Sequence, residues 1–339
     1  MHKLKQYIPL LLLGCSNNDY PLYCKYIYSD GNNVMTCNNS VIVKIELELP
    51  FKGFINLFVI DDVFKNISED FKYEITEDRL IITDGRFRTE LVIEDFEIPD
   101  FSKLFSQIGQ SSFLNVTDEL IDTFKAAIKF TDASKGDRGY IVISKESISA
   151  TDDHRAFYNK DSFVTEECIG INNKILGILD NTCEIVSVGY NTVIRSNNML
   201  FVFSIDKLDF YPVDRLKEII DKYNSVHPLC KFSDLKNAVN KLNSLSFGES
   251  TFFVNIKDKG EHIEVSYESV VNGSASVTIP SIVNDKLENK DSVFVNGKFI
   301  KSINDLDYTV YLNPIFNGII FENDKYTNIL MGVLLLIQK

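Results

Sequence analysis

Short apolar runs and alternating apolar and polar positions recur along almost the whole chain. Examples are "SVIVKIELEL", "FINLFVI", "RLIITD", "YIVISK", "LFVFSI" and "IEVSYESVV". Asn, Asp, Gly and Ser flank these runs, and a two-residue period between such residues is typical of β-strands joined by tight turns. The pattern therefore predicts a chain built mostly of strands.

Two longer segments follow the spacing of an amphipathic helix instead. In "TDELIDTFKAAIKF" (Thr117–Phe130), Thr117 is the expected N-cap, and acidic residues occupy the first turn. In "FSDLKNAVNKLNSL" (Phe232–Leu245), the helix is expected to begin at Ser233. Its buried side would consist of Leu235, Val239 and Leu242. Shorter helix candidates are "DDVFKNIS", "NNKILGILD" and "NGKFIKSINDL".

The same hairpin outline occurs twice. "DRLIITDGRFRTELVIEDFEIP" ends at Pro99 and "NTVIRSNNMLFVFSIDKLDFYP" ends at Pro212, and each carries Asp-Phe shortly before its proline. The two prolines lie 113 positions apart, which is one third of the 339 residues. A third hairpin, "NGIIFENDKYTNILMGVLLL", follows where this period places it. The two long helical segments also lie about one period apart, which favours an internal repeat.

This repeat predicts an α+β chain of three similar domains, each with two helices packed on antiparallel sheets. The expected domains are residues 1–108, 109–226 and 227–339, with joints near Ser106–Ser112 and Ser225–Cys230.

Composition fits a soluble globular chain, with 45% hydrophobic residues and only 8 prolines. No apolar run approaches the roughly 18 to 20 residues that a membrane-spanning helix needs. Six scattered cysteines without a Cys-x-x-Cys pair indicate reduced thiols in a cytoplasm. The net charge of −13 argues against a globally basic nucleic-acid binder, although it leaves a local basic surface open.

The N-terminal stretch "HKLKQYIPLLLLGC" allows two interpretations. A basic start, a leucine run and Gly14 before Cys15 fit a lipoprotein signal, which would make the chain a membrane-anchored protein with β-rich domains. Alternatively, the stretch is a helix of the fold, with Lys3 and Lys5 on its polar side and the leucines in the core. Pro9 then suits a helix start better than a helix interior.

The segment "SISATDDHRAFY" (Ser147–Tyr158) contains the most suggestive polar cluster. Asp152, Asp153 and His154 have the side chains of a divalent-metal site or of a general base with its carboxylate, as in a metal-dependent hydrolase. The competing interpretation is a strand that ends in a polar turn capped by Asp152. The sequence offers no further cluster of ligands, no phosphate-binding glycine loop and no nucleophile motif, so we expect a binding protein without a cofactor or metal and no enzyme.

Lysines recur on the polar sides of the expected helices, and in an acidic chain this repetition favours a local positive surface. Such a surface would attract the phosphates of DNA regardless of base sequence. The lysines expected to face DNA are Lys3, Lys5, Lys125, Lys129, Lys174, Lys236, Lys241, Lys298 and Lys301.

Three passages resemble the bacterial-type DNA sliding clamps, the family of the β subunit of DNA polymerase III. "ATDDHRAFY" (Ala150–Tyr158) is similar to the Ala-Thr-Asp-Gly-His-Arg-Leu-Ala motif of the family, and "LIITDGRFRTELVIEDFEIPDF" (Leu80–Phe101) to its first-domain hairpin passage. "NILMGVLL" (Asn328–Leu335) is similar to the terminal Val-Met-Pro-Met-Arg-Leu of the family.

The resemblance implies a cytoplasmic, non-enzymatic processivity factor. In the family, two three-domain chains join head to tail into a ring, with sheets outside and helices lining the hole. The ring encircles double-stranded DNA, is placed there by a clamp loader and tethers the replicative DNA polymerase. These are the partners, together with a second copy of the chain, that the resemblance implies here.

The resemblance also implies a pocket for short hydrophobic peptides of these partners. The matching positions are Thr151, His154, Arg155, Ala156, Pro212, Leu216, Met331, Gly332 and Val333. Four positions depart from the family pattern, with Asp153 in place of Gly, Ala156 in place of Leu, Gly332 in place of Pro and Leu334 in place of Arg. A missing Leu side chain changes peptide binding by on the order of 1 kcal/mol. The departures suggest a clamp adapted to its own partners, such as a phage-encoded clamp acting in a host cytoplasm.

Overall fold

A computed structural model describes most of the chain. The described residues are 1–17, 21–161, 163, 165, 167–205, 208, 211–223, 228–249, 251–269, 271–282, 292–303, 307–313, 318–324 and 326–331. The chain forms two compact units, one of residues 1–122 and 164–207 and the other of residues 123–163 and 208–339. We call them unit 1 and unit 2 and describe each by itself. The division at residue 122 falls within helix α4 (Asp118–Ala127).

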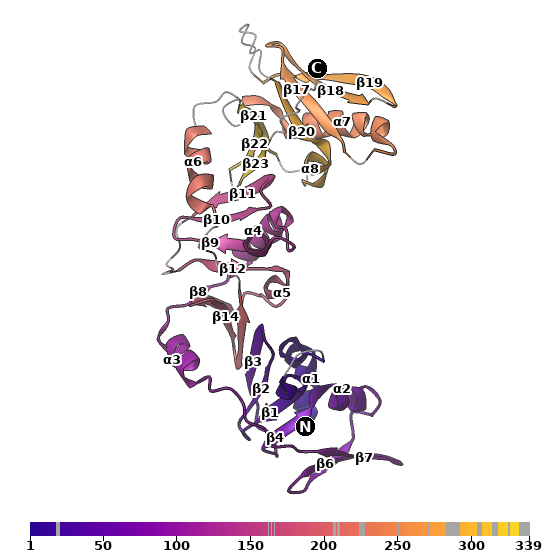
Figure 1. Cartoon of the computed structure of the whole chain (residues 1–339), viewed down its shortest axis with the longest axis vertical. Helices are drawn as coiled ribbons and strands as arrows, with labels where there is room; N and C mark the ends of the chain where they lie inside the picture. The colour runs from indigo at the N-terminus through magenta and orange to yellow at the C-terminus, as the bar shows by residue number, and fades with distance from the viewer. Residues whose placement is uncertain are drawn as a thin grey trace. The chain divides into compact units, whose positions relative to one another are not determined.

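Unit 1 is built around an eight-stranded antiparallel sheet with the order β4-β1-β2-β3-β15-β14-β13-β8 (Figure 1). Its strands are β1 (Tyr26–Ser29), β2 (Asn33–Cys37), β3 (Val41–Glu46), β4 (Gly53–Asn56), β8 (Leu114–Asn115), β13 (Cys183–Val188), β14 (Asn191–Ser196) and β15 (Met199–Ser204). A separate three-stranded sheet contains β5 (Lys72–Ile75), β6 (Arg79–Asp84) and β7 (Phe87–Val92). The remaining elements are α1 (His2–Leu11), α2 (Leu57–Lys65), α3 (Ser102–Gln110), β12 (Ile169–Ile171) and α5 (Asn173–Leu176).

Unit 2 repeats this design. Its main sheet contains, side by side, β9-β10-β11-β23-β22-β21-β16, and a four-stranded sheet has the order β19-β18-β17-β20. The strands are β9 (Ile141–Ile143), β10 (Ser147–Thr151), β11 (Arg155–Lys160), β16 (Pro228–Lys231), β17 (Phe253–Asp258), β18 (His262–Ser269), β19 (Gly273–Pro280), β20 (Ser292–Asn296), β21 (Thr309–Asn313), β22 (Gly318–Glu322) and β23 (Thr327–Met331). The helices are the 3-10 turn η3 (Ile128–Phe130), α6 (Val213–Tyr223), α7 (Phe232–Leu242) and α8 (Gly297–Ser302).

Side chains along β3 point alternately to the two faces of the main sheet in unit 1, and different helices cover these two faces. Val43 and Ile45 are fully buried on the face that contacts α1, whereas Ile42 points to the other face and packs against Ile108 of α3. Figure 1 shows α1 and α2 on one side of this sheet and α3 on the other. The sheet is therefore covered on both faces.

Three helices begin in the same way. Asn56, Asn172 and Asn296 each follow a strand and accept hydrogen bonds from backbone N–H groups of the first turn of α2, α5 and α8. Asn56 explains why the run "FINLFVI", expected to be one strand, changes to helix after its first three residues. That expectation was wrong because local capping of a helix outweighed apolar periodicity.

The N-terminal stretch is helix α1, and its apolar face belongs to the core of unit 1. Leu4, Ile8 and Leu11 are buried, and Pro9 lies inside the helix, exposed in its last turn. The expectation that Pro9 begins a helix was wrong. At this position a proline removes only the hydrogen bond to the carbonyl of Lys5 and keeps its ring in solvent.

Helix Thr117–Phe130 forms as expected, as α4 followed by η3, and Thr117 Oγ1 accepts a hydrogen bond from the Leu120 N–H at 3.2 Å. Helix α7 begins at Phe232, one residue earlier than expected, and buries the three apolar residues predicted for it. All six cysteines are free thiols. In the described part of the chain, no helix has the length and apolar character needed to cross a membrane.

Two helices were not predicted. Helix α3 covers most of the expected joint at Ser106–Ser112, and α6 follows Pro212. At the other expected joint, residues 225–227 lie outside the described residues, and β16 begins at Pro228. Both helices stand at the same place in the repeat, after a hairpin and its proline.

Candidate functional site

A pocket of about 180 Å³ lies in unit 2 between α6 and the face of the main sheet that α6 covers. We call it the α6 pocket. It is lined by Arg138, Thr151, Asp153, Arg155, Ala156, Pro212, Arg215, Leu216, Ile219 and Ile329.

The floor of the α6 pocket is one row of residues across three neighbouring strands. Ala156 of β11 pairs with Thr151 of β10 on one side and with Ile329 of β23 on the other. All three are buried, and Leu216 of α6 faces them with 6% of its surface exposed. Because Ala156 carries only a methyl group, the row leaves room between sheet and helix.

The rim of the α6 pocket carries more positive than negative charge. Arg138, Arg155 and Arg215 contribute guanidinium groups, and Asp153 is the one carboxylate in the lining. Arg138 Nε donates to Asp153 Oδ1 at 2.7 Å, so this pair is locally neutral. Arg138 also pairs with Asp137 at 2.8 Å, and Arg155 pairs with Asp152 at 2.8 Å. Arg215 is therefore the guanidinium that an apolar ligand carrying a carboxylate would meet.

The turn between β10 and β11 holds Arg155 in place. Asp152 accepts hydrogen bonds from the N–H groups of His154 and Arg155, at 3.0 and 2.7 Å, and its Oδ2 accepts from Arg155 Nε at 2.9 Å. Asp153 has a φ of 73°, in the left-handed region. Asp152 therefore caps the turn, as the structural interpretation of this segment predicted.

These contacts argue against the alternative that this segment is the metal site of a hydrolase. The carboxylates of Asp152 and Asp153 are engaged by Arg155 and Arg138, and His154 is exposed. Among the residues that the structure describes, no three His, Cys, Asp or Glu side chains gather as a metal-binding group.

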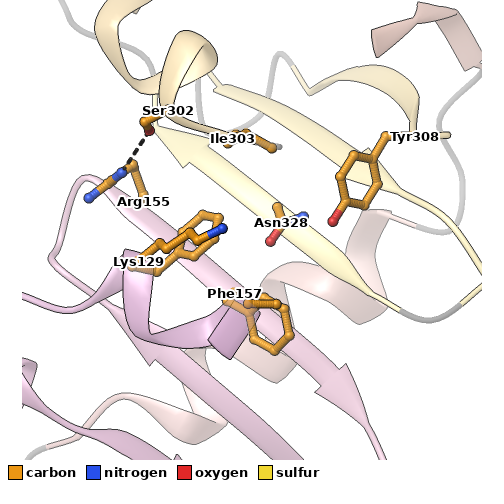
Figure 2. Close-up of a pocket in the computed structure, with 9 residues that line it drawn as sticks. Lys129, Arg155, Phe157, Ser302, Ile303, Tyr308 and Asn328 are labelled. Atoms are coloured by element: carbon orange, nitrogen blue, oxygen red, sulfur yellow. Dashed lines mark hydrogen bonds between the residues drawn. The ribbon is translucent and has the colours of Figure 1, made fainter. Parts of the chain in front are cut away.

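Arg155 also lines a smaller cavity, of about 30 Å³, on the other side of β11 (Figure 2). There its Nη1 donates to Ser302 Oγ at 3.2 Å, and its guanidinium lies 4.4 Å from the centre of the Phe299 ring. Lys129, Phe157 and Asn328 face the same cavity in Figure 2. Arg155 thus connects the α6 pocket with α8 and η3, which carry three of the lysines expected to face DNA.

The structure brings together five of the predicted pocket residues, namely Thr151, Arg155, Ala156, Pro212 and Leu216. His154 lies in the neighbouring turn and does not line the pocket. Met331 is the last residue of β23, and Gly332 and Val333 lie outside the described residues.

Five lining residues were not in the predicted set, namely Arg138, Asp153, Arg215, Ile219 and Ile329, although Asp153 is one of the departures from the family pattern. Apolar residues of α6 recur at Leu216, Ile219 and Ile220, a helical spacing that could have revealed this helix and its buried side. Arg138 precedes β9, and no local pattern connects it with the pocket.

The predicted DNA-facing lysines lie on α1, α4, η3, α5, α7 and α8. Lys5 and Lys236 are half-buried, because Lys5 pairs with Glu69 at 2.9 Å and Lys236 donates to the Ile303 carbonyl at 2.8 Å. The exposed lysines of the set are Lys3, Lys125, Lys129, Lys174, Lys241, Lys298 and Lys301.

In unit 2, Lys129 and the α6 pocket lie on opposite faces of the main sheet. Phe157 of β11 packs against Phe130 of η3, with ring centres 5.9 Å apart, and this face carries Lys129. The adjacent Ala156 points to the face that α6 covers.

Solved structures with the same architecture are bacterial clamps. A DNA polymerase III β clamp from Caulobacter crescentus has a TM-score of 0.75 at 13% identity, covering 97% of each chain. The Helicobacter pylori β clamp has a TM-score of 0.72 at 17% identity over 98% of each chain, and the Bacillus subtilis clamp 0.72 at 13% over 98% of this chain and 97% of its own. This chain has the β sliding-clamp fold. No protein-family model and no curated protein matches its sequence.

The clamp fold confirms the α+β fold class that the sequence predicted and agrees with the resemblance carried by the three passages. The likeness spans nearly the whole chain. The lipoprotein alternative gains no support, since Leu4, Ile8 and Leu11 of the N-terminal stretch belong to the core of unit 1.

Proposed function

We propose that this protein is a DNA sliding clamp, a processivity factor that encircles duplex DNA and tethers the replicative polymerase. One observation carries the proposal, namely the way in which half-sheets are joined. In unit 1 a half-sheet of order β4-β1-β2-β3 is joined to a half-sheet of order β15-β14-β13-β8 by the pairing of β3 with β15. In unit 2 the pairing of β11 with β23 joins two half-sheets in the same way, and their strands follow the same order as those of unit 1.

Two half-sheets remain without such a join among the described residues. The order β19-β18-β17-β20 repeats β3-β2-β1-β4, and β5-β6-β7 repeats β13-β14-β15. An edge strand presents unpaired N–H and C=O groups that accept another strand. Joining β19 of one copy to β7 of another would complete a third sheet of the same kind, so two such joins would close a homodimer into a ring.

The same reasoning supports three modules per chain, at residues 1–108, 109–226 and 227–339. Each would contain one of the helices α1, α4 and α7 and one Asn-capped helix, α2, α5 or α8. The two units would then each combine parts of neighbouring modules, because a joined sheet crosses a module boundary.

The exposed lysines fit the DNA-facing role. They lie on the helices of the three modules, and Lys129 lies on the face of the main sheet of unit 2 opposite the α6 pocket. Their attraction to phosphates is independent of base sequence and weakens with salt, which suits a ring that moves along DNA. Topology rather than affinity would keep the ring on DNA.

The α6 pocket fits short apolar peptides with a carboxylate, from the replicative polymerase and the clamp loader. Support comes from a Helicobacter pylori β clamp of this fold, which was solved bound to a DNA ligase peptide. The protein would act by binding, without chemistry of its own, in the cytoplasm.

Retention on closed DNA tests the proposal. The chain is loaded onto a nicked circular plasmid with a bacterial clamp loader and ATP, and the complex is separated by gel filtration. We expect it to stay on the circle and to leave after a restriction enzyme linearises the plasmid. Equal retention on linear and circular DNA, or a chain that never remains on the circle, would contradict a sliding clamp.

A further inference from the structure

Unit 1 contains a counterpart of the α6 pocket. Ile42 of β3 pairs with Cys37 of β2 and with Val202 of β15. This row stands where Thr151, Ala156 and Ile329 stand in unit 2, because the strand order of the two main sheets is the same. Helix α3 covers the row in unit 1 as α6 does in unit 2.

In unit 1 the side chains of this row fill the space under α3, whereas a cavity opens over the next row of the sheet. Ile42 is larger than Ala156 and packs with Val202 and Ile108, which fills the space under α3. One row further along the same face, Lys44 pairs with Met35, and a cavity of about 350 Å³ opens there. Cavities of roughly 300 Å³ and more accommodate ligands of the size of several side chains.

Aromatic and other apolar side chains form most of the walls of this cavity, which we call the α3 pocket. They are Tyr28, Met35, Ile98, Pro99, Phe101 and Phe105. Lys44 Nζ lies 5.1 Å from the centre of the Phe105 ring, so a cation already occupies one aromatic face. Aromatic walls of this kind are typical anchors for a buried peptide side chain.

The charge around the α3 pocket is opposite to that around the α6 pocket. Asp30 and Asp100 line it, against the single cation of Lys44. The acceptor sites of Asp30 are largely taken by the N–H groups of Asn32 and Asn33 and by the Asn33 side chain. Asp100 is exposed, and its hydrogen bonds come from the backbone N–H of Ser102, at 2.9 Å, and from the Ser102 side chain, so its two oxygens keep acceptor sites for a ligand.

We propose that the α3 pocket is a second peptide-docking site, which takes a short apolar segment carrying Lys or Arg from a partner protein. The apolar residues would enter between α3 and the β2–β3 row, and the cation would bind Asp100. The α6 pocket would disfavour the same peptide because Arg215 in its lining repels the lysine or arginine side chain, whereas Arg138 and Arg155 are paired with carboxylates. One chain would thereby hold two partners of opposite charge at once. The ligand class rests on the peptide-binding role proposed for the α6 pocket.

Two labelled peptides test this assignment on the full chain. Both contain a central Leu-Ile-Phe, flanked by lysines in one and by aspartates in the other, and fluorescence anisotropy reports binding. Ser102→Trp, at the wall of the α3 pocket, should fill the cavity and weaken the lysine peptide about tenfold or more. Gln107→Trp, exposed on the same helix and outside the lining, is the matched control and should change nothing.

Charge is tested separately by Asp100→Asn, which keeps an acceptor for the Ser102 N–H. It should weaken the lysine peptide severalfold and reduce its salt dependence, whereas Arg215→Gln should weaken only the aspartate peptide. The proposal is overturned if the lysine peptide does not bind, if it ignores Ser102→Trp, or if the aspartate peptide competes with it. Failure of the aspartate peptide alone would contradict the role of the α6 pocket and leave the α3 assignment standing.

Discussion

Arg155 is the residue on which the candidate site depends most. Its side chain is 13% exposed, pairs with Asp152 at 2.8 Å, lies over Phe299 and bonds to Ser302. His154, its neighbour in the sequence, is exposed in the turn. Adjacent residues of one motif thus have different tasks, since only Arg155 reaches both faces of the sheet.

We expect Arg155→Ala to lower the free energy of unfolding by about 2–4 kcal/mol, because it leaves the carboxylate of Asp152 buried without its cation. His154→Ala should change it by less than about 0.5 kcal/mol, as an exposed substitution. Urea denaturation of both variants measures the difference. Equal effects of the two substitutions would contradict this division of tasks.

Asp153 combines an unfavourable backbone conformation with a charge at the pocket. Its φ of 73° favours glycine, and its carboxylate neutralises Arg138. We expect Asp153→Gly to leave stability within about 1 kcal/mol, since relief of strain offsets an exposed ion pair. Arg138 then keeps only its pair with Asp137 at 2.8 Å and loses a competing carboxylate, so an acidic peptide should bind more tightly at low salt, as titration calorimetry would report. Unchanged affinity would show that Arg138 does not meet the ligand.

At the scale of elements, helices α3 and α6 decide where ligands fit. Each follows a proline of the repeat, and Ile108 and Ile219 occupy the seventh position of their helices. Beneath these helices, unit 1 has Ile42 where unit 2 has Ala156. The larger side chain fills the space at that row, so the α3 pocket lies one row further along its sheet than the α6 pocket does. Repeated elements can therefore carry different binding preferences without a change in topology.

Helix α1 contains Pro9, a residue that lowers the stability of a helix interior. Pro9 cannot donate to the Lys5 carbonyl, and its ring is exposed. We expect Pro9→Ala to raise the free energy of unfolding by about 1–2 kcal/mol, because alanine restores the bond and favours helix. Gln6→Ala, exposed on the same helix, is the control with an expected change below about 0.5 kcal/mol. A loss of stability on Pro9→Ala, measured by thermal unfolding, would mean that the proline directs the chain after α1.

At the scale of the whole molecule, the proposed function depends on an assembly of two copies. The edge strand β7 exposes two large apolar side chains, Phe87 at 46% and Val92 at 51%. Exposed apolar residues on an unpaired strand are expected where another chain covers them. They agree with a join between β7 and β19 of a second copy.

We expect the double substitution Phe87→Asp and Val92→Asp to convert a dimer into a monomer and to abolish retention on circular DNA, because charges would be buried in the join. Tyr73→Asp, on β5 at the opposite edge of the same sheet, should leave the dimer intact. Light scattering after gel filtration measures both. A dimer that survives the double substitution would place the subunit contact elsewhere.

The sequence by itself determined most of the strands, the helices at Thr117 and Phe232 and the turn at Asp152, because each depends on residues close along the chain. It missed α3, α6 and the strand end at Asn56, where periodicity and helix capping compete within a few residues.

Only the tertiary structure decided the two pockets. Arg138, Ala156, Leu216 and Ile329 meet in one of them although they are far apart in the sequence. Their meeting depends on which strands join at β11 and β23, and a long-range pairing of this kind leaves no local signal. The same holds for the α3 pocket, whose position depends on the volume of Ile42 beneath a helix sixty residues further along the chain.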